Sequence, residues 1–110
     1  MPLSARVRIE VYIPDHFSLA SQKLLIVFNQ EFTETFGGAT LSRGLDGSYL
    51  AQDGRTVRDR INLLYTDTPF SLEGNADPVS SYIANLRQAV LDALQEEAVM
   101  VVAVPVYHPE

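Results

Sequence analysis

The N-terminal part of the sequence alternates strictly between apolar and polar residues over positions 6–13. Successive side chains of a β-strand point to opposite faces, so this pattern predicts a strand with one buried face. Pro14 then ends the strand. The apolar face consists of Val7, Ile9, Val11 and Ile13, and the polar face consists of Arg6, Arg8, Glu10 and Tyr12.

Two later segments have helical spacing. The first covers residues 17–36, with Ser18 or Asp15 as its N-cap, and ends at Gly37-Gly38, where glycine accepts a left-handed conformation. The second opens at Asp77-Pro78, with the aspartate as N-cap and the proline at the first helical position. Their apolar stripes are Leu24, Phe28, Phe32 and Phe36 in the first helix, and Val79, Ile83, Leu86, Val90 and Leu94 in the second.

Five of the six glycines lie within residues 37–67, which raises two alternatives: a phosphate-binding loop or the turns of a β-hairpin. A phosphate-binding glycine loop joins a strand to the N-terminus of a helix. Here the first glycines follow a helix, and the later Asp-Gly pairs separate segments with strand character, 39–43, 48–51 and 56–66. This order favours a hairpin with Asp53-Gly54 at its tip, and a bulge or kink around Gly44 and Asp46-Gly47.

The last predicted strand covers residues 98–107 and is apolar on both faces. The element order is therefore strand, helix, strand, strand, helix, strand, which is typical of the ferredoxin-like βαββαβ fold. We expect one α+β domain over residues 1–110, with a four-stranded antiparallel sheet in the order 4-1-3-2. Both helices should lie on one face, because the two crossovers have the same hand.

Composition narrows the functional classes. The formal net charge is −6 without a run of basic residues, which argues against a nucleic acid or an anionic membrane surface as partner. The absence of cysteine excludes disulfides and thiolate metal sites. The longest apolar run, 98–106, is far short of the roughly 20 residues of a membrane helix, and no signal peptide is visible. We expect a soluble cytoplasmic protein.

The most promising polar residues lie on the two strands expected at the centre of the sheet. The first strand offers Arg8, Glu10 and Tyr12, and the third offers Arg58, Arg60 and Asn62. If their common face is open to water, they form ordinary cross-strand pairs. If two sheets pack face to face, the same residues line a cavity with convergent polar groups, as a small-molecule site does.

The remaining polar candidates rank lower. His16 and His108 follow strands that should be antiparallel neighbours, which places them at opposite ends of the sheet and in exposed loops. Neither histidine has the partner spacing of a metal site, and we expect neither a metal nor a cofactor. Asp67 has the character of a turn residue, and helix capping accounts for Asp77.

Three segments carry a family resemblance: RIEVYIP, GGATLSRGLDGSYL and DGRTVRDRINLLYTD. They resemble small uncharacterised bacterial proteins of ferredoxin-like fold, and more broadly the dimeric α/β-barrel proteins, in which two such sheets pack face to face. That group includes cofactor-free monooxygenases, muconolactone-isomerase-like enzymes and ligand-binding modules. The resemblance implies a fold and a dimer, and it transfers no catalytic residue to this chain.

Three functions are compatible with these observations. The first is a homodimeric small-molecule-binding or interaction module, because the last strand and Ile26 and Val27 of the first helix carry surplus apolar residues. The second is a cofactor-free isomerase, decarboxylase or monooxygenase, whose arginines hold a small anionic substrate while Glu10, Tyr12 or His16 handles a proton. The third is a regulatory subunit that presents its hairpin tip to a partner protein.

Overall fold

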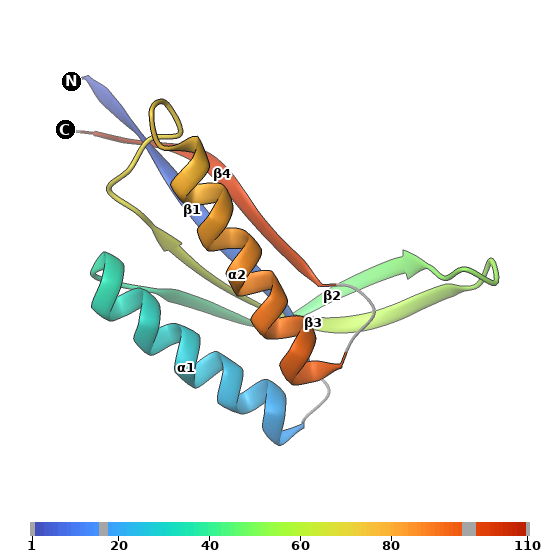
Figure 1. Cartoon of the computed structure of the whole chain (residues 1–110). Helices are drawn as coiled ribbons and strands as arrows, with labels where there is room; N and C mark the ends of the chain where they lie inside the picture. The colour runs from blue at the N-terminus through green and yellow to red at the C-terminus, as the bar shows by residue number, and fades with distance from the viewer. Residues whose placement is uncertain (1, 16–17, 96–98, 110) are drawn as a thin grey trace.

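Six elements follow one another in the predicted order in the computed structural model, which describes residues 2–15, 18–95 and 99–109 (Figure 1). Their bounds are β1 (Leu3–Pro14), α1 (Leu19–Phe36), β2 (Thr40–Leu50), β3 (Thr56–Asp67), α2 (Ala76–Leu94) and β4 (Met100–Pro109). The βαββαβ prediction is confirmed.

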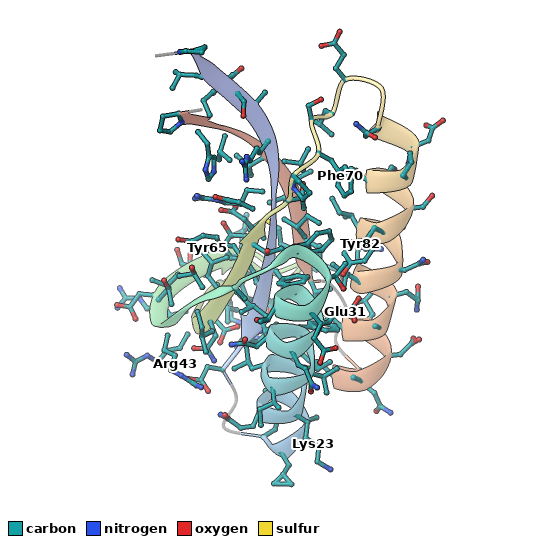
Figure 2. All side chains as sticks on the ribbon, turned by 90° about the vertical axis from the view of Figure 1, so that its left-hand side faces the viewer. Lys23, Glu31, Arg43, Tyr65, Phe70 and Tyr82 are labelled. Atoms are coloured by element: carbon teal, nitrogen blue, oxygen red, sulfur yellow. The ribbon has the colours of Figure 1, made fainter. Side chains whose placement is uncertain are left out.

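The four strands form one antiparallel sheet in the order β2-β3-β1-β4, which is the predicted 4-1-3-2 order counted from the other edge. Val11 of β1 lies opposite Leu64 of β3 on one side and opposite Val101 of β4 on the other. Both helices pack on the same face of the sheet (Figures 1 and 2). We call the opposite face the open face.

The hydrophobic core fills the space between the sheet and the helices. The four apolar residues of β1 are at most 1% exposed, and Phe32 of α1 and Val90 of α2 are fully buried. A row of aromatic rings connects the helices, since Phe36 meets Tyr82 of α2 edge-on with ring centroids 5.5 Å apart. The alternation over residues 6–13 thus correctly predicted which face of β1 is buried in the core.

The helix ends follow local chemistry. Ser18 caps α1 by accepting a hydrogen bond from the Ser21 N–H at 3.1 Å, and Gly37 ends α1 at φ 94°. For α2 the prediction of Asp77 as N-cap is wrong, because the helix already begins at Ala76 and Asn75 occupies the capping position. Asp77 lies inside the first turn, where its negative charge is favourable beside the partial positive charge of the helix N-terminus.

The glycine-rich stretch forms the predicted hairpin, and β2 and β3 extend beyond the helices as a long arm (Figure 1). A bulge interrupts the pairing of β2 with β3 between Ser42 and Leu45, where Gly44 has φ 71°. At the tip, the Gly54 N–H donates to the Ala51 carbonyl at 3.0 Å. Asp53-Gly54 is therefore a turn, and the hairpin prediction is confirmed.

The last strand lies at the edge of the sheet, as predicted. It ends two residues further on than the predicted strand, at Pro109, and Ala98 falls outside the described residues. Val101 and Ala103 pack against the core. The alternate residues Met100, Val102, Val104 and Val106 lie on the open face.

A charged network on the open face of the sheet

The structure divides the six predicted sheet-face residues between the two faces of the sheet. Tyr12 lies opposite Leu63, and Ile13 lies opposite Asn62. Arg8, Glu10 and Tyr12 therefore share the open face with Leu63 and its alternate neighbours on β3, whereas Asn62 is fully buried on the helix side. The prediction of one common face is wrong, because a strand register displaced by one residue exchanges the two faces.

Asn62 has a structural position below the bulge of β2. Its Oδ1 accepts a hydrogen bond from the Gly44 N–H at 3.1 Å, while its Nδ2 has no partner among the described residues. An unpaired buried donor costs about 1–3 kcal/mol of folding free energy. The hydrogen bond from the Gly44 N–H, which holds the bulge of β2 in place, offsets this cost.

Arg58 and Arg60 extend from the arm. They line an open groove of about 570 Å³ that also includes three aspartates, Asp15, Asp46 and Asp59.

Three charged or titratable side chains meet on the open face. Arg8 of β1 donates from Nε to Asp67 Oδ1 at 2.6 Å and from a second nitrogen to Oδ2 at 3.1 Å. His108 Nε2 lies 2.8 Å from the same Oδ2. Asp67 is the last residue of β3 and His108 lies within β4, so the predictions of a turn residue and a loop histidine are wrong. His16 lies outside the described residues.

The network is electrostatically balanced and partly shielded from water. The hydrogen bond from Arg8 lowers the pKa of Asp67 below its ordinary value, and the contact with His108 acts in the same direction, against the opposing effect of burial. The same hydrogen bond raises the pKa of Arg8. The Arg8 guanidinium also lies 4.3 Å above the centroid of the Tyr65 ring, a cation–π contact. Asp67 is thus held as an anion with its charge already paired.

A second polar pair lies nearby on β1. The Tyr12 hydroxyl donates to Glu10 Oε1 at 3.0 Å. Burial, followed by the contact with Glu10, raises the pKa of Tyr12. Tyr12 therefore stays a hydrogen-bond donor over the physiological range.

Apolar side chains surround these polar groups on the open face. Val104 lies opposite Arg8, Val102 opposite Glu10 and Met100 opposite Tyr12. On β3, Ile61, Leu63 and Tyr65 extend the surface, and Figure 2 shows Tyr65 on the side of the sheet away from the helices. The sequence predicted the surplus apolar residues of β4 but not those of β3, because the polar residues of β3, and not these apolar ones, were expected on the open face.

The chemistry open to this site is limited. When His108 is neutral and donates from Nε2 to Asp67, its Nδ1 is left as a proton acceptor. Within the described ranges, no group of three or more His, Cys, Asp or Glu side chains is placed to hold a metal ion. The two described helices are also not long and apolar enough for either one to cross a membrane.

The comparisons with known proteins support the fold. No family model matches the sequence, and a search of curated proteins finds no match. Among solved structures, the chain is similar to the divalent cation tolerance protein (Cut A1) from Thermus thermophilus, with a TM-score of 0.59, 19% identity, and coverage of 97% of this chain and 88% of that one. It is also similar to CutA1 from Oryza sativa, with a TM-score of 0.55, 15% identity, and coverage of 98% and 85%. At these identities the likeness establishes a shared ferredoxin-like fold.

Proposed function

We propose that this chain is a non-catalytic binding or interaction module that works as a homodimer, with the open face of the sheet as the contact between protomers. The observation that carries the proposal is an edge strand, β4, that is apolar on both faces. An antiparallel sheet with one face in water normally alternates apolar and polar residues along each strand. Here Met100, Val102, Val104 and Val106 break that alternation.

A second copy of the chain is the occupant that best fits this surface. The two helices cover the other face of the sheet. Among the described residues, Met100 stays exposed on the open face and the valines of β4 beside it are only half-buried. An exposed apolar edge strand invites association. A two-fold interface is self-complementary, so one apolar patch is enough to form it. We expect the dimer to bury more than about 1,000 Å².

The charged network is compatible with burial in such an interface. Desolvating a charge is costly unless the charge is paired and hydrogen-bonded. Arg8 and Asp67 already neutralise each other through two hydrogen bonds, and only 29% and 19% of their side chains is exposed. Covering this pair would therefore leave neither Arg8 nor Asp67 with an unpaired charge.

A cofactor-free enzyme is the alternative, and the contact between His108 and Asp67 favours it, because an aspartate can orient a histidine that accepts a proton. Two observations weigh against an anionic substrate. The guanidinium of Arg8 is occupied by Asp67, and the groove around Arg58 and Arg60 carries charges of both signs. A crystal structure of the assembled protein separates the two functions, since the enzyme needs an enclosed cavity next to His108 Nδ1.

The interface is tested with Val102→Lys. Val102 lies opposite Glu10, so the new lysine gains a favourable cross-strand partner in the monomer while it places a charge in the proposed interface. The matched control is Gln88→Lys, which adds the same charge on the exposed surface of α2. We expect Val102→Lys to weaken dimerisation at least about 100-fold, with an unchanged circular dichroism spectrum, and Gln88→Lys to leave it unchanged. Equal association of the two variants in sedimentation equilibrium would refute the interface.

A further inference from the structure

A separate cavity lies on the helix side of the sheet, away from the proposed dimer contact. It has a volume of about 240 Å³ and lies between the last turn of α1, the first turns of α2 and the segment 68–75 that precedes α2. Figure 2 shows Phe70 of that segment and Tyr82 of α2 on the same side of the sheet. Ile9 of β1 and Val79 of α2, which are 1% and 7% exposed, belong to its wall.

The wall of the cavity is mainly apolar and carries no charge among the described residues. Three rings line it, those of Phe36, Phe70 and Tyr82, and no Asp, Glu, Lys, Arg or His is among the described residues that line it. The Tyr82 hydroxyl donates to Glu31 Oε1 at 3.2 Å, and burial raises the pKa of Tyr82 to about 12. An ionised ligand would lose its hydration here without gaining a counter-ion, so the wall selects uncharged molecules.

One lining residue has an unused hydrogen-bond acceptor. Asn75 occupies the N-cap position of α2, yet its side chain makes no capping hydrogen bond. Its Nδ2 donates instead to the carbonyls of Ser71 and Glu73, at 3.0 Å and 3.3 Å. Its Oδ1 accepts no hydrogen bond within the described part of the chain. The hydroxyl of Thr68, by contrast, already pairs with the backbone of Phe70.

We propose that this cavity binds a small uncharged aromatic molecule that carries a single N–H or O–H donor, with the rings of Phe36, Phe70 and Tyr82 around it and Asn75 as the acceptor. Size supports this class of ligand. An apolar protein cavity of about 150 Å³ accepts benzene, so 240 Å³ leaves room for a second fused ring. Stacked or edge-on aromatic contacts add to the gain from removing the ligand from water.

Indole is the probe for this site. The chain contains no tryptophan, so indole fluorescence excited beyond the absorption of tyrosine reports on the ligand alone. Titration with the protein should give a saturable blue shift and a rise in anisotropy, with a Kd below about 1 mM. A linear, non-saturating response would overturn the proposal.

Two variants locate the binding. Thr35→Phe fills the cavity from an exposed position of α1, and we expect it to weaken indole binding at least about tenfold. Thr33→Phe is the control, because Thr33 is also exposed on α1 but does not line this cavity. Equal affinities of the two variants would place the indole elsewhere and refute the site.

The role of Asn75 is tested by removing the donor from the ligand and the acceptor from the protein. The unmodified protein should bind indole more tightly than 1-methylindole, which lacks the N–H, by about threefold to tenfold. Asn75→Ala should abolish this preference while still binding both molecules. A preference that persists in Asn75→Ala would contradict the assigned acceptor. Neither result depends on dimerisation, because the cavity and the open face lie on opposite sides of the sheet.

Discussion

Replacing Asp67 by asparagine tests whether the open-face network stabilises the fold. Asp67 accepts two hydrogen bonds from Arg8 and lies 2.8 Å from His108 Nε2. Asparagine keeps the shape of the side chain but removes its charge. Its NH₂ group can only donate, so it would face the N–H groups of Arg8 or His108 without forming a hydrogen bond to them. Arg8 then keeps its position above Tyr65 without a counter-ion.

The expected loss of stability is intermediate between those of a surface pair and a buried pair. Hydrogen bonds to charged groups contribute about 1.5–3 kcal/mol, whereas exposed ion pairs contribute about 0–1 kcal/mol. The side chains of Arg8 and Asp67 are 29% and 19% exposed, so water recovers part of the lost interaction. We expect Asp67→Asn to lower the free energy of unfolding by about 2 kcal/mol at pH 7.

The same variant should show a defined pH dependence. The folded-state pKa of Asp67 lies below its ordinary value of 3.8, so the contribution of its charge is complete above that value. The contribution is lost as the pH falls through the lowered folded-state pKa. The stability difference between the unmodified protein and Asp67→Asn should therefore shrink under strongly acidic conditions. Urea denaturation followed by circular dichroism, at one fixed protein concentration, measures the difference at each pH.

Asp53→Asn is the matched control for this prediction. Asp53 pairs with Arg55 Nε at the same distance of 2.6 Å, but their side chains are 54% and 78% exposed. Solvent screening should keep the effect of Asp53→Asn within about 0.5 kcal/mol. If the two variants lose the same stability, the network on the open face is merely a surface ion pair and the reasoning from burial fails.

Two further predictions concern the helices. Gly37→Ala should lower the free energy of unfolding by about 1 kcal/mol, because Gly37 has φ 94°, a left-handed conformation that alanine disfavours. Gly38→Ala should be nearly neutral, because a Cβ there also meets open space but the backbone is not left-handed. Equal losses of stability in thermal or urea unfolding would contradict this. In a spectrophotometric pH titration, Tyr82→Phe should remove a tyrosine ionisation near pH 12. If the variant instead loses an ionisation near pH 10, the ordinary pKa of tyrosine, the Tyr82 hydroxyl is not shielded from water as described.

Much of the fold could be predicted from the sequence because its signals are local. The alternation of apolar and polar residues predicted β1, and the helical spacing of apolar residues before Gly37 predicted α1. The Asp53-Gly54 turn predicted the hairpin of β2 and β3. These patterns depend on neighbours a few residues apart, and the positions of the apolar residues determine which face of each element is buried.

The network on the open face was harder to predict than the fold, because it depends on the pairing register between β1 and β3. Polarity is misleading in β3, where the buried face includes Asn62 and Thr66 and the open face includes Leu63. These buried polar residues pair with groups that are distant in sequence: Thr66 Oγ1 donates to the Gly38 carbonyl at 2.7 Å, and Asn62 Oδ1 accepts from the Gly44 N–H, although Asn62 Nδ2 has no partner among the described residues. An argument from hydrophobicity alone therefore selects the wrong face.

Self-association through the open face is the central claim, and sedimentation velocity of the unmodified protein over a range of micromolar concentrations tests it most directly. On that face of β4, Met100 is exposed and the three valines are only half-buried in a single chain, so a two-fold dimer should form. The predicted result is a species of twice the 12.2 kDa mass of one chain, with dissociation only on dilution. A single species of 12.2 kDa at every concentration would contradict the account.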